Sequence, residues 1–521
     1  MSITVSEARM FQPGAQTLDP LMPRRWDADD GRQVRAHLQT ALDALAKRKP
    51  LVDARWRYYL GEHDQLWMTN KLKEIFGQQF NAKLEDNWCE LAIEAVVLRL
   101  ELKGWTVRRP DRLVGAAAEQ MVAAVNAQME ANGLDIEQEE VHRVAGIAGE
   151  HYLMAWPRYA DPGDPDDDTQ AVDEDGVPLY DITEQDARNV YVQRGAGGRV
   201  KVFDVKVWRD DAEKRWRATV YYADEVVRLR TVRNSNGGEP PKAERFELDP
   251  DDPGGDNPMG APPFVRFAKD KRGRSRLDSL SPVNDKINKL AVGKIIAAEF
   301  AILGQRYALT DQPIPDNALR NVPGSVWTID PGGDGENGTT PPTRVGQFEV
   351  ADISQFDSAK REEVDTFLTL AMLPKNLRQS AGGSASSGEQ VTKDSGPFVS
   401  MVEDHQQMYG AAWRDLWSLC GYDVEPAWEP AAFANDKDVA EEVKLWTDAG
   451  VPLTVALQHV GWSADDLKAV QDALDDTETK RANASADALR QLDEGRGALA
   501  RLNAAAGVGG GLTGGGSPAT V

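Results

Sequence analysis

The chain has 521 residues and a mass of 57.2 kDa, more than one hydrophobic core usually supports, which predicts roughly two to four substructures. Hydrophobic residues make up 41% of it, enough to exclude a largely disordered polymer. The 84 acidic and 60 basic side chains give a formal charge of −24, which excludes tight, non-specific wrapping of DNA. A sliding contact with DNA stays open, because sliding fails where every phosphate meets a fixed cation.

The cysteines and the most apolar segment indicate the compartment. Cys89 and Cys420 lie far apart within apolar helical patterns, which predicts free buried thiols and a reducing environment. The N-terminus lacks the charged start and apolar core of a signal peptide. The most apolar run, 290–304, is interrupted by Lys294 and Glu299, so we expect no membrane span.

The N-terminal half predicts helices followed by a sheet. Apolar residues recur at helical spacing over 28–60 and again over 115–148. Residues 87–104 carry apolar positions on more than one stripe, which predicts a helix buried on most sides. The period then changes to two in HYLMAWPRYA, RNVYVQRG, VKVFDVKVWRD and RWRATVYYADEVVRLR, which predicts an antiparallel sheet.

A carboxylate-rich segment, 161–176, lies between the first two of these strands. Clustered carboxylates are ligands that calcium prefers, but two prolines and the spacing depart from the EF-hand pattern. A solvated surface loop is therefore favoured over a metal site. We expect neither a metal nor a cofactor.

The strongest basic run, KDKRGRSR, follows the proline-flanked strand PPFVRFA. Two interpretations stay open: a loop that balances nearby carboxylates, or contact with nucleic acid or with the acidic face of a partner. The basic residues are Lys269, Lys271, Arg272, Arg274 and Arg276.

Two long helices are predicted over 283–303 and 351–373, the first about 30 Å long at 1.5 Å per residue. Between them, 304–350 is rich in proline, glycine and turn residues and contains the strand-like segments SVWTID and RVGQFEV. This composition predicts a compact β-containing excursion bracketed by the two helices.

A polar stretch of small residues, MLPKNLRQSAGGSASSGEQVTKDSG, follows the second long helix. It fits a domain linker, a phosphate cradle, or a pliant loop that touches something long and moving. Helical spacing resumes near 389 and continues past Gly396 and Pro397. Proline inside a helix removes a backbone hydrogen bond, which predicts a kink there.

Motifs for catalysis are missing from the sequence. It contains no GxxxxGK with Ser or Thr, no HExxH or Cys-pair spacing around its six histidines, and no nucleophile elbow. We therefore expect that the chain is not an enzyme, and a phosphate cradle for nucleotides is disfavoured.

This order of helices and sheet, long helix, β excursion, second long helix, pliant loop and kinked helix resembles the portal proteins of long-tailed double-stranded DNA bacteriophages. The resemblance covers about residues 30–470. The segments that carry it are RYYLGEHD, NWCELAIEAVVLRL, GRSRLDSLSPVNDKINKLAVGKIIAAEF, FDSAKREEVDTFLTLAML and SAGGSASSGEQ.

The resemblance implies an α+β, mainly helical, portal-type ring subunit. The domains it implies are an N-terminal arm (1–27), a wing (28–282), a stem helix (283–303), a clip (304–350), a second stem helix (351–373), a tunnel loop (374–388), a kinked helix returning to the wing (389–434), a helical crown (435–500) and a disordered tail (501–521).

The family also implies that copies of the tunnel loop contact DNA at a constriction of the ring. Small hydroxyls and amides contact phosphate without base preference, and glycines let each copy shift independently. The residues implied are Arg378, Gln379, Ser380, Gly382, Gly383, Ser384, Ser386, Ser387 and Lys393.

Portals are rings, commonly of about twelve subunits, at one capsid vertex. The implied partners are further copies of the chain, double-stranded DNA in the channel, the terminase large subunit, a head-tail connector, and the major capsid and scaffolding proteins, with no membrane. The implied location is the virion, after assembly in the host cytoplasm. Another phage head or tail structural protein is one alternative, and a metal-dependent hydrolase using the acidic loop is a second.

Overall fold

The computed structural model describes residues 24–62, 86–108, 116–160, 169–173, 176–195, 200–233, 238–303, 306–309, 344–347, 353–374, 388–432 and 436–459, with a few residues of 467–473. The chain divides into two compact units, Met1–Ala431 and Ala432–Val521. The first combines helices with antiparallel sheets, so the α+β class expected from the sequence is correct. Within the described ranges, no helix is long and apolar enough to cross a bilayer.

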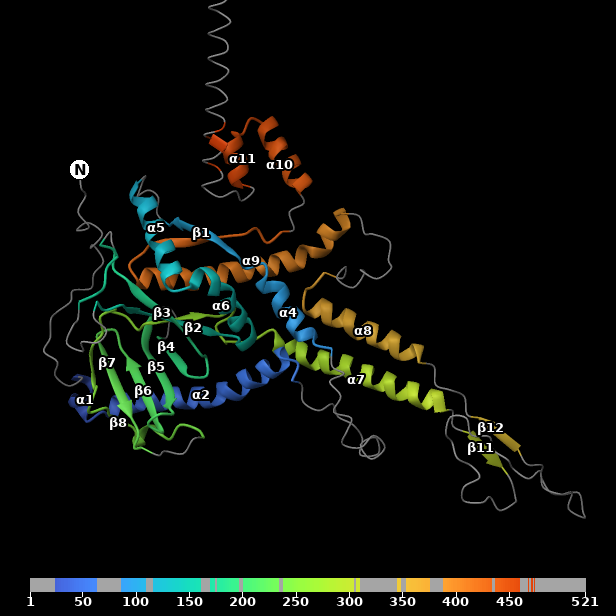
Figure 1. The fold of residues 1–521 in the computed structure, drawn as a ribbon, viewed down its shortest axis with the longest axis horizontal. Coiled ribbons are helices and arrows are strands. Elements are labelled where there is room, and N and C mark those ends of the chain that lie inside the picture. Colours follow the sequence, from blue (N-terminus) through green and yellow to red (C-terminus); the bar gives the residue numbers. More distant parts are fainter. Residues whose placement is uncertain are drawn as a thin grey trace, which may run out of the picture. The chain divides into compact units, whose positions relative to one another are not determined.

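A long N-terminal helix covers the larger sheet (Figure 1). The apolar stripe of α2 (Arg32–Tyr59), including Val34 and Leu38, forms one core with strand residues such as Val205 and Val220. The short α1 (Arg24–Asp29) precedes it. The sheet has the strand order β4-β5-β6-β7-β8, and β9 also pairs with β7. The strand bounds are β4 (Val190–Arg194), β5 (Lys201–Asp210), β6 (Arg215–Tyr221), β7 (Glu225–Arg230), β8 (Glu247–Leu248) and β9 (Gly254–Asp256). A 3-10 turn, Ala243–Arg245, precedes β8.

A second core lies between a three-stranded sheet and the remaining helices of the first unit. Large aromatic side chains dominate it, among them Phe267, Tyr409, Trp413 and Trp417, all fully buried. The elements that surround it are β10 (Phe264–Phe267), β2 (His151–Pro157) and β3 (Tyr180–Gln185), in that order in the sheet, with α4 (Trp88–Val97), α5 (Ala116–Ala131), α6 (Leu134–Ala148) and α9 (Gly388–Leu419).

One predicted helix is shorter than its apolar pattern. The helix expected over 87–104 ends at Val97, and the chain continues as β1 (Leu102–Val107). This strand pairs antiparallel with β13 (Val424–Trp428), with Val107 opposite Val424. The partner strand is more than 300 residues downstream, so the local pattern carried no sign of it and the tertiary pairing overrides helical propensity.

Two neighbouring helices extend from the second core toward a short β ladder (Figure 1). They are α7 (Leu277–Leu303) and α8 (Ser354–Leu370), and the strands between them, β11 (Arg306–Leu309) and β12 (Arg344–Gln347), pair antiparallel. The helix α7 starts six residues before the predicted residue 283 and runs through Pro282.

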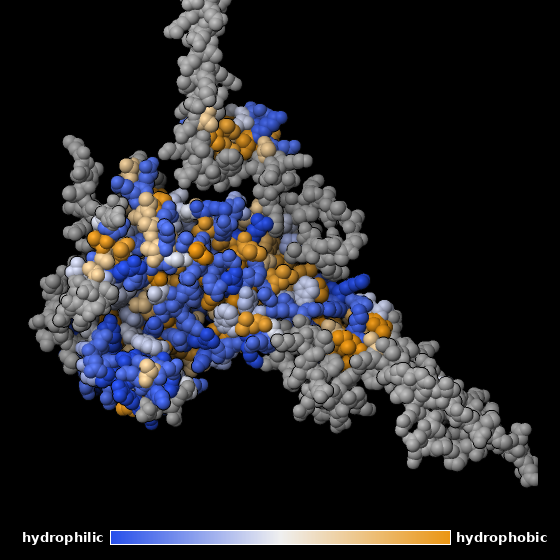
Figure 2. All heavy atoms as spheres, in the orientation of Figure 1, coloured by the Kyte–Doolittle hydropathy of each residue, from blue (hydrophilic) through white to orange (hydrophobic). Residues whose placement is uncertain are grey.

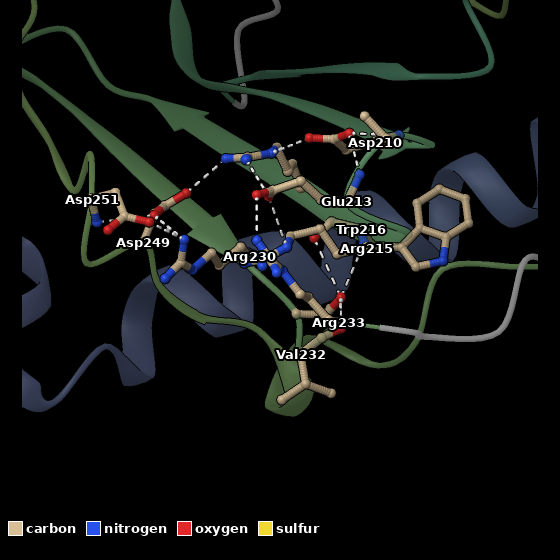
Figure 3. A network of polar contacts seen from close by, with 12 residues as sticks. Asp210, Glu213, Arg215, Trp216, Arg230, Val232, Arg233, Asp249 and Asp251 are labelled. Carbon is tan, nitrogen blue, oxygen red and sulfur yellow. Dashed lines mark hydrogen bonds and ion pairs between the residues drawn. The ribbon is translucent and has the colours of Figure 1, made fainter.

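The six-stranded sheet carries a network of ion pairs (Figure 3). Arg217 on β6 contacts Asp210 at 2.9 Å, Glu213 at 2.7 Å and Asp249 at 2.8 Å. Asp249 is buried and also contacts Arg230 on β7 at 3.0 Å. Hydrophilic residues cover this region of the face drawn in Figure 2. The network links neighbouring strands through side chains as well as through the backbone ladder.

The second compact unit contains two short helices within its described residues, α10 (Asp436–Asp448) and α11 (Leu453–His459). They contact each other. The turn between them places Gly450 at a φ of 91°, a backbone conformation that favours glycine.

Candidate functional site

The base of α7 is anchored by the last residue of the basic stretch. The Arg276 guanidinium donates hydrogen bonds to the carbonyl oxygen of Ala371, where α8 ends, and to that of Ala92 on α4 at 3.3 Å. Burial lowers the pKa of Arg276 to about 10, so the side chain is still charged at neutral pH. Arg276 therefore joins three helices and is not presented to a ligand.

A second arginine fixes the first turn of α7 to α2. Arg55 is buried and makes a bidentate contact with Asp278, at 2.8 Å and 2.7 Å. It also donates to the carbonyl oxygens of Ala148 at 2.5 Å and Gly273 at 3.1 Å. The carboxylate of Asp278 lies at the helix N-terminus, where the helix dipole favours negative charge. The direction in which α7 leaves the core is set by these contacts.

Two buried asparagines on α7 hold the segment that starts α4. The side-chain oxygen of Asn284 accepts from the backbone N–H of Trp88 at 3.1 Å, and that of Asn288 accepts from Asp86 at 2.9 Å. Both side chains are fully buried. Because an unpaired buried amide is costly, these contacts specify one position of α7 against α4.

Beyond this base, α7 and α8 pack as an antiparallel pair. Lys286 lies 3.6 Å from Glu363, and Lys294, further along α7, lies 2.6 Å from Asp357, earlier in α8. Contacts that advance along one helix while they retreat along the other define antiparallel packing. Gly293 permits the approach, since a Cβ there would lie 3.0 Å from the Phe356 ring.

The outer half of α7 leaves apolar side chains partly exposed. Its buried residues end at Asn288, whereas Leu290 and every described residue of 291–298 are only partly buried. At about 100° per residue, Ile295 lies opposite Lys286 and Gly293, and Val292 lies opposite Lys294, so both fall on the side away from α8. Figure 2 shows apolar patches along this helix pair.

The remaining basic residues of 269–276 lie in different surroundings. Lys269 is partly buried, and burial together with the nearby Arg276 lowers its pKa. Arg274 forms an ion pair with Asp270 at 2.7 Å. Lys271 and Arg272 are exposed and line a surface hollow with Arg274. The stretch is thus divided between internal anchoring and a solvent-facing site.

The predicted tunnel-loop residues Arg378, Gln379, Ser380, Gly382, Gly383, Ser384, Ser386 and Ser387 lie outside the described residues, and the side chain of Lys393 does too. The flanking elements are described. Leu373 and Pro374, just past α8, are buried. Pro397 lies within α9, after the exposed Gly396, and Figure 1 shows α9 changing direction toward its N-terminal end.

Several cations that line this hollow were not predicted from the sequence. Lys47 and Arg48 belong to α2, and Arg194 ends β4. On their own segments they follow the spacing of ordinary exposed residues, so only the fold brings them to Lys271 and Arg272.

Within the described ranges, no group of three or more His, Cys, Asp or Glu side chains is placed to hold a metal ion.

Comparison with known proteins found likenesses among solved structures alone. No family model matches the sequence, and no curated protein does. Among solved structures, the chain is similar to one from a structure described as "Virion of native gene transfer agent (GTA) particle". The identity is 11%, the alignment covers 70% of this chain and 85% of the other, and the TM-score is 0.37.

Proposed function

We propose that the chain is the subunit of a portal ring, a phage structural protein through which double-stranded DNA enters and leaves a capsid. The observation that carries the proposal is the α7–α8 pair, which is anchored at its base by Arg276 and Asp278 and whose outer half carries apolar side chains that are only partly buried. A second copy of the chain would bury these side chains further, which favours association through this helix. In a ring, the same helix of the next copy covers it.

The arrangement of neighbouring elements supports this proposal over a generic oligomer. A β ladder lies between the two helices, as a clip would between stem helices, and α9 with its internal Pro397 follows the segment in which a tunnel loop is expected. The sequence resemblance assigns the same parts in the same order.

The proposed partners follow from the proposed role. They are about eleven further copies of the chain, double-stranded DNA in the channel, the terminase large subunit, a head-tail connector, and capsid and scaffolding proteins at one vertex of the virion. The subunit has no catalytic activity of its own in this proposal, and ATP hydrolysis belongs to the motor. The residues of 374–388 contact DNA without base preference.

Native mass spectrometry and top-view electron micrographs of the purified chain test the proposal. We expect a closed ring of about twelve subunits around a channel of at least the ~20 Å width of a DNA duplex. A closed assembly without such a channel would replace the portal by another head or tail structural protein. A chain that stays monomeric at all concentrations, also with scaffolding protein added, would remove the ring itself.

A further inference from the structure

A basic hollow that includes Arg55 lies on the surface of a chain whose overall charge is strongly negative. Its volume is about 670 Å³, and it is lined from α2, from β2, β4 and β10, from the turn 271–274 and from the first turn of α7. Eight of its lining residues are basic and two, Glu150 and Asp278, are acidic, so its formal charge is +6.

The floor of the hollow is built from charges that are already paired. The buried carboxylate of Glu150 lies 2.5 Å from Arg48 and 2.5 Å from Arg266. Burial opposes the charge on Arg266, but the nearby Glu150 raises the pKa of the guanidinium. Arg48 also donates to the carbonyl oxygen of Val190 at 2.6 Å. These contacts fix the positions of Arg48, Arg266 and Glu150 and use most of their hydrogen-bonding groups, so few remain for a ligand.

The rim carries cations that have no such partner. Lys47, Lys271 and Arg272 are exposed, and none of them forms an ion pair with a carboxylate among the described residues. They come from two elements that are more than 220 residues apart in sequence. In a chain with 84 acidic side chains, these three exposed cations line one hollow without an ion pair among the described residues.

The turn that supplies two of these cations is fixed. Asp270 accepts hydrogen bonds from the backbone N–H groups of Arg272 at 2.8 Å and Arg274 at 3.1 Å. A Cβ at Gly149, which has a φ of 84°, would lie 2.3 Å from the carbonyl oxygen of Gly273. The turn therefore packs directly on the end of α6, and a ligand would meet cations on a preorganised backbone.

We propose that this hollow binds the phosphate groups of a polyanion. A phosphate presents several oxygens in different directions and matches cations that converge from separate elements, and the arginine fork suits it particularly. A single carboxylate is satisfied by one or two arginines, as Glu150 is here. The site does not depend on the chain being a portal subunit, since it needs no second copy.

Two probes distinguish the sources of the phosphate, namely labelled inorganic tripolyphosphate and a short labelled DNA duplex, both measured by fluorescence anisotropy with the full chain. The test variant is K47Q/K271Q/R272Q, and the matched control K49Q/K242Q/R245Q removes the same charge at exposed residues outside the hollow. We expect the test variant to lose roughly tenfold or more in affinity and the control to stay within about twofold.

Comparing the binding of the two probes identifies the class of ligand. Duplex binding that tripolyphosphate displaces, with a salt dependence weakened in the test variant, assigns the site to a nucleic-acid backbone. Tripolyphosphate binding without duplex binding assigns it to a free polyphosphate. Equal binding by test and control variants, or binding of polyglutamate but of neither phosphate probe, would overturn the proposal.

Discussion

Gly293 on α7 faces Phe356 on α8 so closely that a Cβ at Gly293 would lie 3.0 Å from the aromatic ring. Glycine in a helix costs up to about 1 kcal/mol relative to alanine, so its presence in the middle of α7 indicates that the approach of the two helices matters more than helix propensity. The partly exposed Phe356 can yield by a few tenths of an ångström, but not by the length of a larger side chain.

Substitution at Gly293 therefore separates helix propensity from packing. We expect Gly293→Ala to change the free energy of unfolding little, because the gain in propensity offsets the tight contact. We expect Gly293→Leu to lower it by about 1–3 kcal/mol through overpacking. Alanine and leucine have similar helix propensity, so urea unfolding that gave equal stability for both variants would show that α7 and α8 do not pack this closely.

Arg276→Met tests the anchor at the base of the helix pair. The substitution keeps an apolar stem of similar length but leaves the carbonyl oxygens of Ala371 and Ala92 without their donor. We expect the free energy of unfolding to fall by about 2–4 kcal/mol, measured by urea denaturation. Arg272→Met is the control, because Arg272 lies on the same turn but is exposed, and a loss of the same size there would place the effect in the turn itself.

The partial burial of apolar side chains on the outer half of α7 leads to a prediction about assembly. Val292 and Ile295 lie three residues apart on the side of α7 away from α8 and are only partly buried. We expect V292Q/I295Q to remain folded by circular dichroism but to fail to form rings in native mass spectrometry. V200Q/V202Q makes the same kind of change at exposed positions near β5 and should assemble normally. Rings formed by V292Q/I295Q would exclude α7 from the subunit interface.

Local periodicity was enough to predict the elements that carry one clear pattern. The helical spacing over 28–60 corresponds to α2, and the alternating segment around residue 220 forms β6 and β7. Such elements bury one face, so the spacing of their apolar residues directly reflects the core that they contact. The α+β class follows from the same patterns.

The sequence did not predict the roles of residues whose partners lie far away in the chain. The pairing of β1 with β13 and the position of Arg276 between α4 and α8 both join segments far apart in the chain. A basic residue in a basic run has the same local pattern whether its guanidinium reaches solvent or a buried carbonyl oxygen. The hollow was missed for the same reason, since α2 supplies Lys47 and a distant turn supplies Arg272.

Asp249 and Asp251 offer a matched pair in the network of Figure 3. The side chain of Asp249 is 4% exposed and contacts Arg217 and Arg230, whereas that of Asp251 is 81% exposed and contacts Arg230 alone. We expect Asp249→Asn to lower the free energy of unfolding by about 1–3 kcal/mol, because it weakens two charge-assisted contacts in a buried place. Asp251→Asn should have little effect, as for other exposed ion pairs. Equal effects in urea unfolding would show that burial of Asp249 does not strengthen its contacts.

Burial of His142 predicts a loss of stability in acid. The Trp413 indole N–H donates to His142 Nε2 at 3.0 Å, and the imidazole stacks on Tyr409 with ring centroids 5.3 Å apart. The accepting nitrogen must be unprotonated, and burial lowers the pKa of His142 to about 3, from an ordinary value of 6.5. As the pH falls below 6.5, His142 therefore binds a proton in the unfolded chain but not in the folded chain.

The sign of the effect follows from this difference. The stabilising contribution of neutral His142 is complete above about pH 6.5 and is lost progressively toward pH 3. His142→Gln cannot titrate, while its side-chain oxygen can still accept from Trp413. We expect this variant to be less stable at pH 7 but to lose less free energy of unfolding between pH 6.5 and pH 4, measured by urea unfolding across that range. Parallel pH dependences for the two proteins would show that His142 titrates normally in the folded state.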